Sequence, residues 1–157
     1  MKTITIKEQE QISEIIQECN ICFAAVADSK GTPYVLPMNF GYKDGIIYLH
    51  SAPEGRVIRI LEENNQICIS FCTGSDIVAQ HPQVACSYRM KAKSVVASGK
   101  VTFIEDLAEK EAALHILMAQ YSDKTFTYST PALKNVKIWK IPIETVSCKA
   151  FAEPHQK

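Results

Sequence analysis

Apolar residues recur along the chain with two periods, and these periods divide it into helices and strands. Between residues 12 and 19 they recur at helical spacing, which predicts an amphipathic helix over residues 7–19. Between residues 66 and 73 they occupy every second position, which predicts a strand with one apolar face. The same reasoning predicts further strands at 21–28, 33–42, 46–51, 84–88, 92–104 and 136–143, and further helices at 57–64 and 107–121.

Turn residues mark where these segments reverse direction. Asp44-Gly45 suits the positive φ angles of a tight hairpin between two strands. Gly99 indicates a bulge or a close approach within a strand, and Pro142 indicates a sheet edge or a bulge. Residues 122–135 are rich in Ser, Thr and Pro, which indicates a long loop able to cover a site. Six or seven short strands in mostly hairpin order predict a mainly β barrel with peripheral helices, in one domain spanning residues 1–157.

Charge and composition narrow the partners that the chain is expected to have. The 17 Lys and Arg residues balance the 17 Asp and Glu residues, so no general field attracts nucleic acid or an anionic membrane. An anionic ligand must then be held by a local pocket, which points to a small molecule. The N-terminal residues are polar and charged rather than leader-like, and the longest apolar run, 21–27, is too short to span a bilayer. We therefore expect a cytoplasmic protein whose six cysteines are reduced.

The segment 50–56 joins a strand to a helix and carries a candidate phosphate site. Free backbone N–H groups at the start of a helix favour an anion. Ser51 adds a hydroxyl donor, and Arg56 adds a charged fork that matches phosphate oxygens. Ala52 and Gly55 are small enough for the backbone to approach a ligand closely. The alternative that these residues leave open is a capped surface helix with an exposed arginine.

Three stretches of sequence carry a family resemblance. They are Tyr34–Phe40 (YVLPMNF), Asp44–Arg56 (DGIIYLHSAPEGR) and Lys93–Val101 (KSVVASGKV), followed by a helix at 109–121 and a final strand that contains Trp139. Together they resemble the 5-nitroimidazole resistance (Nim) proteins of the pyridoxamine 5′-phosphate oxidase-like flavoprotein superfamily. The His-Ser-Ala-x-x-Gly-Arg element combined with Ser-Val-x-x-x-Gly-Lys carries the specificity of the match, and either element alone is weak.

The resemblance implies a six-stranded split β-barrel that forms a homodimer, with two flavin sites at the subunit interface. In that pattern the strand at 37–39 lies along the isoalloxazine ring of FMN, and Ser51 and Arg56 hold its phosphate. FAD carries the same flavin and first phosphate, so it stays open as the cofactor. The chain departs from the pattern at Val57, where relatives carry a basic residue, and this puts one phosphate contact in doubt. The residues implied in cofactor binding are Pro37, Met38, Asn39, His50, Ser51, Ala52, Gly55, Arg56, Ser94 and Trp139.

His50 and Trp139 each admit two interpretations. A histidine that closes an apolar strand is more often structural than catalytic, but the resemblance makes His50 the candidate catalytic residue beside the flavin. A side chain that titrates near neutrality suits proton delivery. Trp139, the only tryptophan, is either a core residue of the last strand or a wall packed against the flavin.

Cys19 and Cys22 form a C-x-x-C pair, the spacing of many zinc and redox sites. A structural zinc site needs four ligands, and Cys68 and Cys72 lie four apart on a predicted strand, which is poor ligand spacing. We therefore expect no metal site. The remaining cysteines are expected to act as small apolar groups, on a barrel face for Cys68 and Cys72 and in buried positions for Cys86 and Cys148.

Three functions are compatible with this combination. The first is a flavin-dependent reductase that passes electrons from a reduced nicotinamide or another donor to a small acceptor such as a nitroimidazole. The second is a non-catalytic flavin-binding or flavin-storage protein, because a fold does not determine a function. The third, oxidation of pyridoxamine phosphate, is disfavoured because the basic and aromatic residues that would bind that substrate's phosphate are not evident. Reoxidation that depends on acceptor concentration separates the first function from the second.

Overall fold

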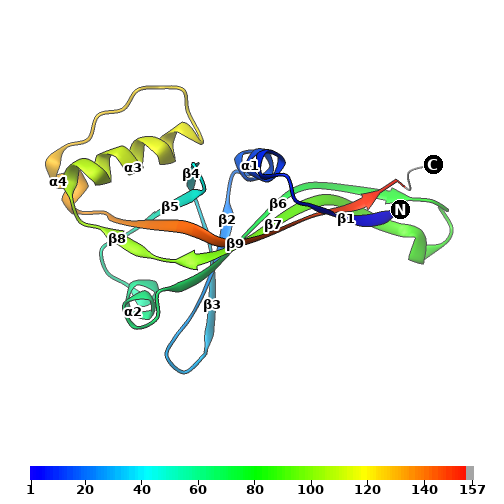
Figure 1. The fold of residues 1–157 in the computed structure, drawn as a ribbon, viewed down its shortest axis with the longest axis horizontal. Coiled ribbons are helices and arrows are strands. Elements are labelled where there is room, and N and C mark those ends of the chain that lie inside the picture. The colour runs from blue at the N-terminus through cyan, green and yellow to red at the C-terminus, as the bar shows by residue number, and fades with distance from the viewer. Residues whose placement is uncertain (155–157) are drawn as a thin grey trace.

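In residues 1–154, the part of the chain that the computed structural model describes, nine antiparallel strands pair into one continuous sheet. The strand order is β3-β2-β6-β7-β9-β5-β4, with β1 and β8 also paired to β9. The strands are β1 (Lys2–Ile6), β2 (Cys22–Ala27), β3 (Pro33–Met38), β4 (Gly41–Lys43), β5 (Ile46–Ser51), β6 (Gln66–Ala79), β7 (Tyr88–Lys100), β8 (Thr102–Ile104) and β9 (Lys137–Glu153). The helices beside the sheet (Figure 1) are α1 (Gln9–Gln17), α2 (Arg56–Glu63), α3 (Leu107–Ala119) and α4 (Thr130–Lys134). None of them is long and apolar enough to cross a bilayer.

The longest strand, β9, joins two parts of the sheet and crosses most of the molecule in Figure 1. Residues 137–142 pair with β5 and β8, whereas residues 143–153 pair with β7 and β1. At this change of partner the register against β7 shifts between Ser98 and Gly99. A Cβ at Gly99 would collide with the backbone oxygen of Pro142, so the strands approach too closely there for any other residue. The bulge and close approach predicted at these positions are confirmed, and such a bend helps to curl the sheet into a barrel.

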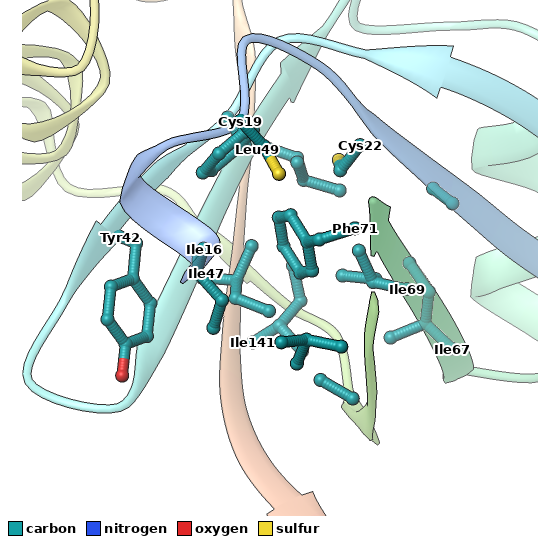
Figure 2. Close-up of a cluster of buried hydrophobic side chains, with 14 of the residues drawn as sticks. Ile16, Cys19, Cys22, Tyr42, Ile47, Leu49, Ile67, Ile69, Phe71 and Ile141 are labelled. Carbon is teal, nitrogen blue, oxygen red and sulfur yellow. The ribbon is translucent and has the colours of Figure 1, made fainter. Parts of the chain in front are cut away.

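The main core lies between the inner face of the sheet and α1. Phe71 on β6 is 0% exposed and packs edge-to-face against Phe40, with the ring centres 4.9 Å apart. Figure 2 shows Phe71 surrounded by side chains from α1, β5, β6 and β9, among them Ile16, Leu49, Ile69 and Ile141. A smaller cluster lies under α3 and consists of Ile104, Ala113, Leu117 and Ile138. The helical spacing that predicted α1 therefore marks the side of that helix that faces the sheet.

The hairpin between β4 and β5 positions the start of the candidate phosphate segment. Its two-residue turn has φ of 50° at Asp44 and 75° at Gly45, the left-handed values that the Asp-Gly sequence predicts. The turn returns the chain alongside β9. There His50 pairs with Ile138 and Ser51 pairs with Lys137.

The outer face of β3, β2, β6 and β7 carries exposed apolar side chains. Pro37 pairs with Phe23, which pairs with Ser70, which in turn pairs with Val96. Directly paired residues project from the same face, so these side chains form one surface. Phe23 is 44% exposed and Val96 is 38% exposed. Val35 and Ser94 each lie two residues before a member of this row, so they project from the same face. We call this surface the outer sheet face, and it consists of Phe23, Val35, Pro37, Ser70, Ser94 and Val96.

Beyond their predicted ends β6 and β7 continue as a two-stranded arm, residues 73–93, which extends away from α2 and α3 (Figure 1). The strand predicted at 84–88 is wrong, because residues 85–87 form a short 3-10 turn at the tip of this arm. The Ser87 hydroxyl donates to the backbone oxygen of His81 at 2.8 Å and accepts the His81 N–H at 3.1 Å. These local bonds replace the partners that a strand would need.

Other elements also differ from the prediction. The strand predicted at 33–42 is divided into β3 and β4, and the strand predicted at 92–104 is divided into β7 and β8. β1 was not predicted, and β9 continues to Glu153 because β1 and β7 both pair with its second half. The segment expected to be a loop contains α4. Ser129 caps this helix by accepting the Ala132 N–H at 3.4 Å, and Pro131 stands in the first turn, where a free N–H is not needed. The buried Lys110 donates to two backbone oxygens near α4 and so connects it to α3.

Candidate functional site

The connection between β5 and α2, residues 51–56, combines a hydroxyl, a glycine and an arginine. At Gly55 φ is 145°, a value that strains any residue with a side chain. A Cβ there would meet no atom within 4 Å, so glycine is required by the backbone conformation, and the space in front of it is open. Within residues 1–154 no side chain caps α2, so its first backbone N–H groups have no side-chain acceptor. Arg56 is exposed, as the surface-helix alternative expects, but the cap that this alternative requires is missing among these residues.

Arg56, the first residue of α2, lies over an aromatic ring. Its guanidinium carbon is 4.4 Å from the centre of the Tyr34 ring on β3. Nearby, the backbone N–H of Thr32 is the main cause that lowers the pKa of the Asp28 carboxyl, and the Arg56 charge lowers it further. That N–H lies 2.8 Å from Asp28 Oδ1, and the N–H of Lys30 lies 2.9 Å from it. Since Arg56 forms no ion pair with any described residue, its N–H donors remain available to an anion.

Ser51 ends β5 and lies against Trp139. The indole Nε1–H donates to Ser51 Oγ at 3.1 Å, and the Ser51 hydroxyl donates to the Ala52 carbonyl at 2.9 Å. Trp139 is 0% exposed and packs edge-to-face near Phe103, so in this chain it is a core residue closed off from a ligand. Because an indole N–H can only donate, Ser51 Oγ must accept there. The serine proton is left to point at the Ala52 carbonyl or at a ligand.

His50 and Ser51 are neighbours in sequence but project from opposite faces of β5. Ser51 shares the face of the buried Leu49 and reaches Trp139, whereas His50 shares the face of its partner Ile138, which belongs to the cluster under α3. The His50 ring is solvent-accessible in this chain, yet the protein around it removes part of its hydration and lowers its pKa. Adjacency in sequence therefore does not bring these two side chains together.

The other predicted cofactor residues lie on the outer sheet face or next to it. Pro37 and Ser94 both belong to this face, on β3 and β7. Met38 turns inward and packs against the core, and Asn39 is exposed just after β3. In the described part of the chain no side-chain hydrogen bond connects Ser94 to the 51–56 connection. The predicted set is thus dispersed: some residues lie in that connection and some on or near the outer sheet face, whereas Met38 and Trp139 pack in the core and His50 lies on the opposite face of β5 from Ser51.

Comparison with known families gives a match over nearly the whole chain. The family model for pyridoxamine 5′-phosphate oxidase matches residues 8–150. This protein belongs to the pyridoxamine 5′-phosphate oxidase family. Among solved structures, a candidate 5-nitroimidazole antibiotic resistance protein from Bacteroides thetaiotaomicron is 46% identical, with a TM-score of 0.87 over 95% of this chain and 87% of that chain. A comparison with curated proteins finds no match.

Two members of this structural group share the fold at lower identity. The flavocytochrome Anf3 from Azotobacter vinelandii is 20% identical, with a TM-score of 0.82 over 98% of this chain and 72% of that chain. An FAD and heme binding protein from Mycobacterium smegmatis is 16% identical, with a TM-score of 0.83 over 100% of this chain and 77% of that chain. The resemblance to this flavoprotein group and the prediction of a mainly β split barrel with peripheral helices are confirmed.

The residues of the 51–56 connection fit the phosphate of the flavin nucleotide that the family fold implies. Three features suit an anion: the open space at Gly55, the start of α2, and Arg56, the last two having, respectively, no side-chain cap and no ion-pair partner among the described residues. Ala52 is exposed beside them. Val57 instead packs against the core, so the position where Nim-like relatives carry a basic residue adds no charge here.

The cysteines contribute mainly to packing. Among residues 1–154 no group of three or more His, Cys, Asp or Glu side chains is placed to hold a metal ion. Burial raises the pKa of the Cys19 thiol and raises that of Cys22 to about 12, so both remain protonated and are poor ligands and nucleophiles. Of the others, the structure places Cys68 half-buried and Cys72 exposed on β6, Cys148 in the core as predicted, and Cys86 exposed at the arm tip, where the prediction of burial is wrong.

Sequence reasoning missed Tyr34 and Asp28 as neighbours of Arg56. Tyr34 belongs to one of the family stretches, but its contact is with a helix that comes later in the chain, and no spacing rule joins the two. The available signal was that Tyr34 is an aromatic residue on the inner side of an edge strand, but the same pattern is also typical of a core residue.

Proposed function

We propose that this protein binds FMN between the two chains of a homodimer and uses it to reduce a small acceptor, with a nitroimidazole as the first candidate. The bound flavin supplies the redox chemistry, taking electrons from a reduced nicotinamide or another donor. The protein's residues bind and orient it. The choice of acceptor is supported by the 46% identity to a candidate 5-nitroimidazole antibiotic resistance protein.

The observation that carries this proposal is the 51–56 connection. Its hydroxyl, its helix start without a side-chain cap and its arginine without an ion-pair partner among residues 1–154 form a local anion site in a chain of zero net charge. FAD is the alternative cofactor, and one feature favours it. A groove of about 320 Å³ beside Arg56 is also lined by Lys30 and Arg59, whose charges suit a second phosphate, although the carboxylates of Asp28 and Glu63 line it too.

A homodimer accounts for the apolar side chains that one chain leaves exposed. Besides the outer sheet face, the arm carries Ile77, 69% exposed, directly paired with Met90, 48% exposed. Exposed apolar surfaces of this kind mark interaction sites. A second copy lying over the outer sheet face covers it. It also supplies its own 51–56 connection next to Pro37 and Ser94, residues that a single chain keeps apart from that connection.

His50 is the candidate proton donor in this proposal. Reduction of a nitro group consumes protons as well as electrons, and a histidine can supply them near neutrality. A flavin-binding role without turnover is the second candidate function. It is favoured by the direction of His50, which projects from the face of β5 opposite to Ser51.

The decisive experiment follows the flavin through one catalytic cycle. The purified protein is expected to show a flavin absorption spectrum that bleaches anaerobically with NADH or NADPH. It is then expected to recover at a rate that rises with the concentration of a 5-nitroimidazole. Extraction and chromatography of the chromophore distinguish FMN from FAD.

Each other outcome contradicts a defined part of the proposal. Protein that neither carries flavin nor takes it up from FMN or FAD overturns flavin binding. Bleaching without acceptor-dependent recovery contradicts the reductase and supports the second candidate function, flavin binding without turnover. Bleaching by pyridoxamine 5′-phosphate in place of the nicotinamide identifies an oxidase of that substrate. A flavin-loaded monomer at micromolar concentration in sedimentation overturns the shared site.

A further inference from the structure

We propose that Tyr34 is a positioning residue for the flavin phosphate, because its ring holds the Arg56 guanidinium in place at the start of α2. This inference rests on the proposed function, since it takes Arg56 as a phosphate ligand. The distance of 4.4 Å from the guanidinium carbon to the ring centre lies within the range of cation–π attraction. Tyr34 acts through Arg56 and does not itself contact the flavin.

The Tyr34 ring is a fixed platform for the arginine. The backbone of Tyr34 pairs with Val26 of β2, and its half-buried side chain packs against the core on the same face of β3 as Leu36 and Met38. A ring that packing already holds loses little further freedom when a guanidinium stacks on it. Arg56 is thereby ordered before the ligand arrives, which lowers the entropy cost of binding.

Whether Arg56 contacts an aromatic ring or a carboxylate decides how many of its N–H donors stay available to a ligand. A carboxylate in direct contact would accept the guanidinium N–H groups and compete with phosphate for them. The carboxyl of Asp28, which lies in the same groove as Arg56, instead accepts the backbone N–H groups of Lys30 and Thr32, and it forms no ion pair with Arg56. An aromatic ring attracts the cation without occupying those donors. Tyr34 therefore orients Arg56 and leaves its N–H groups available for an anion.

The test compares FMN with riboflavin, which has the same ring and ribityl chain but no phosphate. Affinities of flavin-free protein for both are measured by fluorescence titration. Arg56→Ala is expected to weaken FMN binding about 10- to 150-fold and to leave riboflavin binding unchanged. Tyr34→Leu is expected to weaken FMN binding about two- to fivefold, again without change for riboflavin. Tyr34→Phe keeps the ring face, so it is expected to retain the wild-type preference for FMN.

Two controls separate positioning from general effects. Arg59→Ala removes an equal charge one turn later on α2 and is expected to reduce the FMN preference less than Arg56→Ala. In the flavin-free wild-type protein, ring current from Tyr34 is expected to shift the NMR signals of the Arg56 side-chain protons upfield. That measurement needs no variant, so it remains decisive if Tyr34→Leu fails to fold.

The outcomes distinguish failure of the inference from failure of the proposed function. If Arg56→Ala leaves the FMN preference intact, the phosphate lies elsewhere, and the proposed phosphate site fails together with the inference. If Arg56→Ala is selective but Tyr34→Leu is not, or if Tyr34→Phe loses as much as Tyr34→Leu, only the positioning role is overturned. Equal weakening of FMN and riboflavin by Tyr34→Leu also overturns it, as does an unshifted Arg56 spectrum in the wild type.

Discussion

The two faces of the same sheet differ in what their side chains contact. On the inner face Phe71 is 0% exposed and packs against Phe40, whereas on the outer face Phe23 is 44% exposed. The same contrast separates the last two residues of β5. Ser51 is held by the buried Trp139, and His50 remains accessible. Inward residues thus have their partners within the chain, whereas apolar residues of the outer sheet face such as Phe23 remain exposed.

β2 shows what this contrast teaches about sequence patterns. Its sequence, CFAAVA, is apolar at every position, yet only Cys22, Ala24 and Val26 are buried. A strand that is apolar on both faces is typical of one covered on both sides. Here one cover is the core of the chain, and we propose a second copy of the chain as the other cover.

The largest expected effect concerns His50 and asks whether an outward residue carries chemistry. His50→Ala is expected to lower nitroimidazole turnover about 10²- to 10⁴-fold at matched flavin content, because it removes a general acid. Stopped-flow reoxidation measures this rate. Turnover within a few-fold of wild type assigns His50 to the scaffold and favours the flavin-binding protein.

The pH dependence of the wild type gives the same residue an independent readout. Desolvation lowers the pKa of His50, so the neutral form dominates at pH 7, and a rate that needs the protonated form rises as the pH falls below about 6.5. Stability changes in the opposite direction. The unfolded chain binds the proton at higher pH than the folded one, so the free energy of unfolding decreases as the pH falls below about 6.5. His50→Ala is expected to remove this contribution to both slopes.

The second prediction compares one phenylalanine from each face. Phe71→Ala removes a fully buried ring and is expected to lower the free energy of unfolding by about 3–5 kcal/mol. Phe23→Ala is expected to change it by no more than about 0.5 kcal/mol, measured by denaturant titration of flavin-free monomer. Similar losses for both variants would mean that the outer sheet face is already packed within the single chain.

The third prediction tests what covers the outer sheet face. Phe23→Glu places a charge in the proposed interface and is expected to raise the dimer dissociation constant by roughly 30-fold or more, since central apolar residues contribute about 2 kcal/mol or more. Ala108→Glu adds the same charge at an exposed position on α3 and is expected to leave the dimer unchanged. Sedimentation equilibrium measures both. Dimers of equal strength would place the interface elsewhere.

Local signals in the sequence predicted the fold well where structure depends on neighbouring residues. The turn at Asp44 and Gly45, the bulge at Gly99 and the amphipathic α1 all follow from local conformational preference or periodicity. The arm and the second half of β9 were not predicted to their full length. Their strands are stabilised by pairing between segments distant in sequence, which a local pattern does not record.

The candidate site was predictable as a set of residues but not as an arrangement. Family stretches and helix-start chemistry identified Ser51 and Arg56. Because side chains alternate along β5, His50 and Ser51 project from opposite faces of the strand. Their adjacency in the sequence suggested that the two side chains lie close together, and the strand geometry contradicts this. The role of Tyr34 depends on the approach of α2 to β3, a tertiary contact that follows from packing.

The smallest expected effect concerns the inward side of the comparison, where Trp139 donates its N–H to Ser51. Trp139→Phe keeps an aromatic ring but removes this donor, so Ser51 Oγ is no longer restricted to accepting there. We expect the preference for FMN over riboflavin to decrease about two- to tenfold, the range of one hydrogen bond. Ser51→Ala provides the matched control. If Trp139 acts through the Ser51 hydroxyl, Trp139→Phe has no further effect on the preference for FMN in a protein that already carries Ser51→Ala. Non-additive losses in the double variant support this connection. Additive losses would show that Trp139 affects phosphate binding only through packing.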